Sequence, residues 1–283
     1  MSKSQPLHSM SFDVEEWFQV ANHAEVCPRA EWDRLESRVE LAMDRILALL
    51  ERRESRATMF FLGWIAERHP GLVKRCLDGG HEVASHGYDH RFLAELGPEG
   101  LRADLLRTEE ALAAAGAPKP RGFRASTFTL TRATWWALDV LLECGYSYDS
   151  SVHPIRHPTY GVPGFEPGIS HVELNKGTIV EFPVSTYPIL GRNWPIGGGG
   201  YFRLLPGPLQ RAMIGGLERR GRATATYLHP WEFDPDQPLV EVSAGKRFRH
   251  RVGLGRTLDR LDLFLKRFPC DSMENVLKRA GFL

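Results

Sequence analysis

The chain has 283 residues, of which 42% are hydrophobic and 25% are charged, and its 36 basic residues nearly balance its 35 acidic ones. These proportions exclude a disordered or fibrous protein, and the formal net charge of +1 gives no sign of a nucleic-acid-binding surface. The most apolar uncharged run, residues 57–66, is much shorter than the roughly 18 residues that a membrane-spanning helix needs.

Short β-rich runs alternate along the chain with longer stretches of helical period. Strands are predicted at residues 9–14, 58–62, 82–85, 122–125, 146–149, 178–183 and 223–228. Helices are predicted at residues 33–53, 71–78, 99–115, 131–143, 256–268 and 272–280. This alternation is typical of right-handed βαβ units, so we expect an α/β fold built around a parallel sheet or barrel.

Two regions depart from the alternation. Residues 152–202 are rich in proline and glycine and are expected to be mostly loop. From about residue 234 onward the chain carries a basic segment and then the last two predicted helices. We therefore expect a main domain at 9–235 and a C-terminal helical extension at 236–283 that packs on it.

Acidic residues follow the first predicted strand, in the run Ser11-Phe12-Asp13-Val14-Glu15-Glu16. Side chains alternate along a strand, which places Asp13 and Glu15 on one side and Glu16 on the other. Two carboxylates on one side can divide their work, one binding a metal ion and the other acting as a base. A solvated acidic loop is the alternative interpretation of this run.

Two histidines follow the third predicted strand, in Ser85-His86-Gly87-Tyr88-Asp89-His90. If the segment turns helically after the strand, His86 and His90 lie on one face and reach the same ion. Two histidines and one carboxylate form a catalytic zinc set that leaves a coordination position for water. Histidines buried for packing explain the same spacing without a metal.

Polar residues stand at or just beyond the ends of five separate predicted strands. They are Asp13, His86, Arg124, Asp149 and His229. In parallel α/β barrels the carboxyl ends of the strands form the face on which active sites are built. The complementary chemistry of these five side chains indicates an active site there.

These motifs, in this order, resemble those of the polysaccharide deacetylases of the NodB-homology class, which are similar to carbohydrate esterase family 4. The similarity runs from about residue 9 to residue 235 and is strongest to the branch associated with exosortase and exopolysaccharide loci. The C-terminal extension, with Phe248-Arg249-His250-Arg251, also resembles that branch. The resemblance implies a distorted (β/α)7-type barrel.

The resemblance also implies roles for the first two motifs. Asp13 matches the catalytic base, and His86 and His90 match the metal-ligand pair. The family's usual metal-binding aspartate is replaced here by Val14, and a divergent branch uses an acid two positions after the base. That acid is Glu15, and the adjacent Glu16 is the alternative ligand.

The remaining motifs supply the other expected groups. Arg124 matches the arginine that tethers the catalytic aspartate, and the backbone near Thr127 matches the donor to the oxyanion. The usual proline of this motif is replaced by Ser126. His229, in Leu228-His229-Pro230, matches the general acid, and Asp149 lies near the place of an acid that supports it.

Several further residues are candidates for binding the substrate. Trp17 and Trp231 follow the first and last motifs and can stack on a sugar, although tryptophan more often serves packing. Gly199, within the run of four glycines at 197–200, allows backbone to approach a ligand closely. The basic run 246–251 is either a solvated loop or a grip on an anionic glycan or a membrane surface.

The sequence thus predicts a metal-dependent hydrolase that removes N-acetyl groups from amino-sugar units of a polysaccharide or its precursor, with Zn²⁺ as the expected ion. Two alternatives remain, an amidohydrolase of the same fold that opens a cyclic amide or imide, and a non-catalytic glycan-binding protein. The oligomeric state stays open, a homo-oligomer included.

The expected location is the cytoplasm, where the protein would reach precursors at the inner membrane surface. The first ten residues, MSKSQPLHSM, lack the apolar core of a secretory signal. The four cysteines lie dozens of residues apart, which suits neither a zinc-binding CxxC pair nor a disulfide framework.

Overall fold

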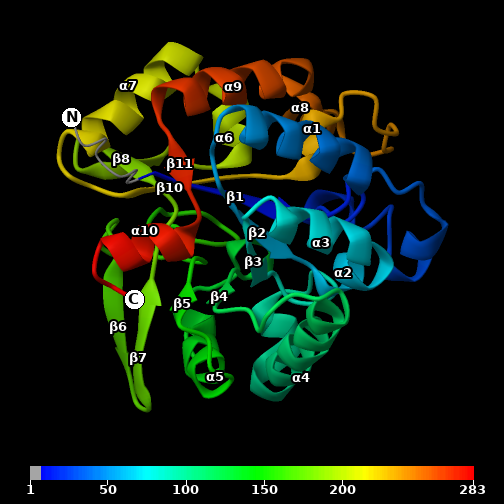
Figure 1. Ribbon diagram of the computed structural model, residues 1–283, viewed down its shortest axis with the longest axis horizontal. Helices are drawn as coiled ribbons and strands as arrows, with labels where there is room; N and C mark the ends of the chain where they lie inside the picture. Colours follow the sequence, from blue (N-terminus) through cyan, green and yellow to red (C-terminus); the bar gives the residue numbers. More distant parts are fainter. Residues whose placement is uncertain (1–7) are drawn as a thin grey trace.

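The computed structural model describes residues 8–283 and has a parallel sheet at its centre (Figure 1). Seven parallel strands pair in the order β10-β1-β2-β3-β4-β5-β7, and β6 adds to β7 in the antiparallel sense. The strands of this sheet are β1 (His8–Val14), β2 (Thr58–Phe61), β3 (Glu82–Ser85), β4 (Gly122–Phe123), β5 (Tyr148–Asp149), β6 (Ser170–Leu174), β7 (Gly177–Glu181) and β10 (Thr224–Leu228). A short strand, β11 (Cys270–Asp271), also pairs with the start of β1.

The two ends of the parallel series are bridged by hydrogen bonds. Ser185, four residues beyond β7, donates its backbone N–H to the carbonyl of Ala225 in β10, and its hydroxyl accepts from the Ala225 N–H. Among the described residues this contact takes the place of a continuous ladder between β7 and β10. The expected α/β class is confirmed, and the strands follow one another around the sheet as in a distorted barrel.

Helices surround the sheet (Figure 1). They are α1 (Val39–Arg52), α2 (Gly63–Arg68), α3 (Pro70–Asp78), α4 (Leu93–Ala114), α5 (Ala137–Glu143), α6 (Gly199–Leu204), α7 (Gly207–Glu218), α8 (Ala244–Arg251), α9 (Thr257–Arg267) and α10 (Met273–Arg279). In α1 the buried residues recur at helical spacing, as Val39, Met43, Ile46 and Leu50, and this apolar stripe packs into the main core. No helix within residues 8–283 is both long enough and apolar enough to cross a membrane.

The last helix, α10, packs against inward-facing side chains of the sheet. Its backbone begins at the amino ends of two strands, where Met273 N–H donates to Thr58 Oγ1 and Glu274 N–H donates to Glu82 Oε2. The same small core contains Phe60, Ala84, Tyr148, Val180, Phe182, Ala225, Met273, Val276 and Leu277. The chain's end therefore covers the sheet at the edge where the strands start, opposite to the edge where they end.

Some sequence expectations need correction. The first helix begins at Val39 rather than residue 33, because residues Arg29–Arg34 form a separate 3-10 turn. Helix α4 begins earlier than expected, at Leu93, and bends at Gly97, where φ is 65°. Besides the predicted strand that is β7, the region expected to be mostly loop holds β6 and a two-stranded sheet of β8 (Thr186–Ile189) and β9 (Arg192–Pro195).

Candidate active site

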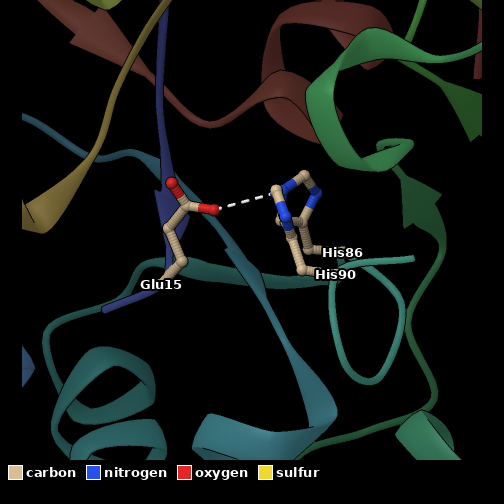
Figure 2. Close-up of side chains that lie close together, drawn as sticks. All are labelled: Glu15, His86 and His90. Atoms are coloured by element: carbon tan, nitrogen blue, oxygen red, sulfur yellow. Dashed lines mark ion pairs between the residues drawn. The ribbon is translucent and has the colours of Figure 1, made fainter. Parts of the chain in front are cut away.

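Glu15, His86 and His90 lie together at the carboxyl ends of β1 and β3 (Figure 2). One ligand atom from each lies within 4.8 Å of the others, and all three side chains are buried. The helical turn that we expected between the histidines is absent. Instead a loop turns back on itself, with φ values of 76° at Gly87 and 59° at His90. Figure 2 shows the two imidazoles facing the Glu15 carboxylate.

The electrostatics of this group suit a cation. His86 Nδ1 lies 2.8 Å from the carbonyl oxygen of Arg124, which must accept, so the proton sits on Nδ1 and Nε2 keeps a free lone pair. Burial lowers the pKa of His86 to about 4 and keeps the ring neutral. Burial disfavours the charged form of Glu15, yet the imidazoles of His90 and His229 beside it lower the pKa of its carboxyl to about 2.

Glu15 is held by a partner that the sequence did not reveal. The indole N–H of Trp231 donates to Glu15 Oε1 across 3.1 Å, and Glu15 Oε2 lies 3.0 Å from His90 Nε2. Apart from this ion pair, Oε2 is buried and accepts no hydrogen bond from the described part of the chain. A buried, ionised carboxylate oxygen beside two imidazoles matches the donor set of Zn²⁺ or a similar divalent metal.

Glu16 points elsewhere. Its Oε1 accepts hydrogen bonds from Ser37 Oγ at 2.5 Å, from Arg38 N at 2.9 Å and from Val39 N at 3.0 Å. These donors lie at the start of α1, whose first N–H groups have no partner inside the helix. Glu16 therefore caps α1, and the carboxylate beside the histidines is that of Glu15.

Asp13 lies next to this group and is bound by Arg124. Its Oδ1 accepts from Arg124 Nη1 at 2.6 Å, and both side chains are buried. The guanidinium also donates to Ser11 Oγ and Ser150 Oγ, and it stacks over the ring of Phe60 with 4.2 Å to the centroid. This ion pair fixes the Asp13 carboxylate in place and leaves Oδ2 free to face the site.

His229 stands on the other side of the group. Its Nε2 lies 3.9 Å from Asp13 Oδ2 and 3.8 Å from Glu15 Oε1. Burial alone would lower the pKa of His229, but the hydrogen bond to Glu232 and the charges of Glu15 and Asp13 raise it to about 9. His229 is therefore charged at neutral pH and carries a proton to give.

The carboxylate that holds His229 is not the one we expected. Glu232 Oε1 lies 2.7 Å from His229 Nδ1, and Glu232 Oε2 accepts from Arg203 Nε at 2.5 Å. Asp149, the expected support, instead accepts from Ser151 N and Ser151 Oγ. The only signal in the sequence was the spacing of three residues between His229 and Glu232.

The residues predicted to bind substrate are mostly committed to packing. Trp17 and Trp231 are 5% and 7% exposed, and the indole of Trp17 donates to the carbonyl of Glu36. A Cβ built on Gly199 would lie 2.1 Å from Glu232 Oε1, so this glycine makes room for that carboxylate rather than for a ligand. Thr127 is half-buried, and its φ of 53° places its backbone in the left-handed region.

Comparison with protein families divides the chain into two matched parts. Residues 33–148 match the family "Polysaccharide deacetylase", and residues 150–278 match a "Domain of unknown function (DUF3473)". The first matched segment, less than half of the chain, is thus similar to the polysaccharide deacetylases. The resemblance seen in the motifs is thereby confirmed for this segment.

Curated proteins that match a part of the chain include two peptidoglycan-N-acetylglucosamine deacetylases. A peptidoglycan-N-acetylglucosamine deacetylase of Bacillus cereus is 39% identical over 68 residues, which are 24% of this chain and 25% of that protein. Peptidoglycan-N-acetylglucosamine deacetylase PgdA of Listeria monocytogenes is 39% identical over 67 residues, 24% of this chain and 14% of that protein. The chain thus matches a quarter or less of the length of these relatives.

Solved structures share the fold over almost the whole chain. A protein of Mycobacterium smegmatis assigned as a polysaccharide deacetylase superposes with a TM-score of 0.66 at 20% identity, covering 100% of this chain and 94% of that one. The Bc1960 peptidoglycan N-acetylglucosamine deacetylase superposes with a TM-score of 0.52 at 17% identity, covering 96% and 88%. At 17–20% identity these superpositions show a shared fold and nothing about activity.

Proposed function

We propose that this protein is a metal-dependent hydrolase that removes acetyl groups from N-acetylated amino sugars of a glycan or its precursor. The observation that carries the proposal is the placement of a carboxylate bound by arginine and a protonated histidine, Asp13 and His229, beside the Glu15–His86–His90 group. Hydrolysis of an amide needs a base for water and an acid for the amine, and these two side chains offer both.

Glu15, His86 and His90 are the proposed metal ligands. A divalent cation there would lower the pKa of water and polarise the amide carbonyl, and both effects promote hydrolysis of an amide. The residues suit such an ion because the His86 ring is neutral and the Glu15 carboxylate is ionised. The indole N–H of Trp231 donates to Glu15 Oε1 and fixes the carboxylate, as hydrogen-bond partners of metal ligands commonly do.

Asp13 is the proposed general base. Arg124 occupies Oδ1, so Oδ2 is the atom that takes the proton from the attacking water. The same guanidinium holds the carboxylate in position through its ion pair. The backbone near Thr127 is the proposed donor to the developing oxyanion, by analogy with the family.

His229 is the proposed general acid. Its Nε2 delivers a proton to the amine nitrogen as the C–N bond breaks, a role that typically contributes about 10²–10⁴-fold to the rate. Glu232 binds Nδ1 and stabilises the imidazolium, while Arg203 keeps Glu232 ionised. In agreement with this, the pKa of Glu232 is lowered against the effect of burial, chiefly by the charge of Arg203.

We place the proposed reaction in a domain at 9–235, with 236–283 as its extension, and propose a glycan substrate because several relatives carry names of peptidoglycan or chitin deacetylases. The test is acetate release from N-acetylglucosamine oligomers by protein stripped of metal and reloaded with Zn²⁺. His86→Ala should abolish both metal binding and release, whereas His171→Ala, an exposed histidine of β6, should leave both unchanged. Release that persists without metal, or in the His86→Ala variant, would overturn the proposal.

A further inference from the structure

Helix α8 has two faces with different environments. On its inner face, the imidazole of His250 stacks on the indole of Trp231 with 4.3 Å between ring centroids. His250 Nε2 also lies 2.7 Å from Gln237 Oε1, and its backbone carbonyl accepts from Arg203 Nη1. Because Trp231 binds Glu15, the inner face of α8 lies one side chain away from the candidate active site.

The outer face of α8 is exposed and combines apolar with basic side chains. We call the α8 surface the open groove lined by Leu239, Ala244, Arg247, Phe248, Arg251 and Val252. The helical members stand at positions 244, 247, 248 and 251, the spacing that puts side chains on one face. Leu239 is 73% exposed and Phe248 is 63% exposed, so two large apolar groups lie in water beside one another.

Positive charge is concentrated in the same helix. Residues 244–251, AGKRFRHR, hold four lysine or arginine residues and no acid, although the chain as a whole carries a net charge of only +1. Arg247 is exposed on the outer face, and the Arg251 guanidinium, four residues on, donates to the carbonyls of Pro235 and Gln237. Like charges at this spacing weaken a helix. Such a distribution costs stability in the free protein, and an anionic partner would relieve that cost.

We propose that the α8 surface binds the surface of an anionic lipid bilayer. A bilayer offers a layer of negative headgroups for the exposed Arg247 and an apolar region for Leu239 and Phe248. A polyanionic glycan would neutralise the charges but would leave the two apolar side chains in water. If the proposed function holds, docking at α8 also brings the site to glycan precursors carried on a membrane.

The experiment uses the full, Zn²⁺-loaded protein and sedimentation with vesicles. Vesicles containing phosphatidylglycerol should bind the protein at least tenfold more tightly than vesicles of phosphatidylcholine, and salt should weaken the binding. Each basic residue near an anionic surface contributes about fivefold, so Arg247→Glu should weaken binding by about tenfold or more. The double variant Leu239→Ser/Phe248→Ser should do the same, through loss of apolar burial.

The matched control is Leu190→Ser, because Leu190 is 97% exposed but lies at the β8–β9 turn, away from α8. It should bind vesicles as the unaltered protein does. Equal binding to both kinds of vesicle, equal losses in the Leu190 variant, or unchanged binding in the Leu239/Phe248 variant would overturn the proposal. The last result together with displacement by soluble alginate would identify an anionic glycan as the partner instead.

Failure of the docking proposal and failure of the proposed function are distinguishable. Acetate release from soluble N-acetylglucosamine oligomers should be the same in the Leu239→Ser/Phe248→Ser variant as in the unaltered protein. Loss of vesicle binding with intact acetate release in that variant is the expected pattern. Absence of acetate release in all proteins, with lipid binding retained, would contradict the proposed function alone.

Discussion

Replacing Glu232 by glutamine should lower the pH at which the enzyme loses activity on the alkaline side. Glu232 Oε1 lies 2.7 Å from His229 Nδ1, and the pKa of His229 is raised to about 9 from an ordinary value of 6.5. Two unit charges about 4 Å apart in an effective dielectric of about 20 interact by about 4 kcal/mol, which corresponds to about three pKa units. Even partial loss of this interaction should lower the pKa of His229 by about two units.

The measured quantity is kcat/KM against pH for acetate release by the Zn²⁺-loaded proteins. Because the acid must be protonated, activity falls as pH rises through the pKa of His229, and this limb should move down by about two units in Glu232→Gln. At pH 8 the variant should lose about tenfold, and near pH 6 the loss should be small. A cation held by Glu15 affects the pH profiles of the unaltered protein and of Glu232→Gln in the same way. The difference between the two profiles therefore reports the effect of Glu232 on the pKa of His229.

Two controls accompany this variant. Glutamine leaves the buried Arg203 without a charged partner, which costs about 3–5 kcal/mol of stability, so folding must be verified by circular dichroism at the assay temperature. Asp149→Asn removes a buried carboxylate that makes its hydrogen bonds to Ser151, and it should leave the alkaline limb where it is. An unmoved limb in Glu232→Gln, or a moved one in Asp149→Asn, would refute the assignment of Glu232 as the partner of His229.

Three further predictions separate metal binding, catalysis and stability. In a calorimetric titration, Glu15→Ala should weaken zinc binding by at least tenfold with little change in stability. Glu16→Ala should keep its zinc affinity and lose about 1–3 kcal/mol of unfolding free energy, because it uncaps α1. A larger loss of zinc affinity in Glu16→Ala than in Glu15→Ala would contradict this assignment. Asp13→Asn should keep one bound metal and lose at least about 100-fold in kcat, because asparagine accepts no proton, and near-normal turnover would show that another group is the base. Burial raises the pKa of Asp104, whose Oδ2 accepts from Tyr88 N, from 3.8 to about 6. A carboxyl with a raised pKa stabilises the fold below its unfolded pKa, and this contribution is lost as pH rises towards 6. Asp104→Asn should therefore gain up to about 3 kcal/mol relative to the unaltered protein between pH 4 and pH 8, and parallel stability curves would contradict this.

The sequence predicted the central strands well because their local signals are strong. The strand at 82–85 was placed as observed, and the starts or ends of most others differ by one or two residues. The polar residues that follow these strands could be predicted to meet, since parallel strands bring their carboxyl ends to one edge of the sheet. Asp13, Glu15, His86, Arg124 and His229 do lie together there.

Contacts between distant segments could not be predicted in the same way. Arg203 lies 29 residues from Glu232, in a helix with no motif, and only the packing of α6 against the chain after β10 brings them together. His86 and His90 lie together as predicted, but a loop and not a helical turn joins them, because Gly87 adopts a left-handed backbone conformation. The two tryptophans that we expected to bind substrate are buried, since Trp17 donates to the Glu36 carbonyl and Trp231 stacks on His250 of α8.

The most direct measurement is a titration of Zn²⁺ into metal-free protein in which acetate and new free amine are measured together on N-acetylglucosamine oligomers. The account predicts that the rate rises with added zinc and saturates at about one equivalent per chain, with acetate and amine formed in equal amounts. Binding of zinc without any release of acetate, or release that does not depend on metal, would contradict it.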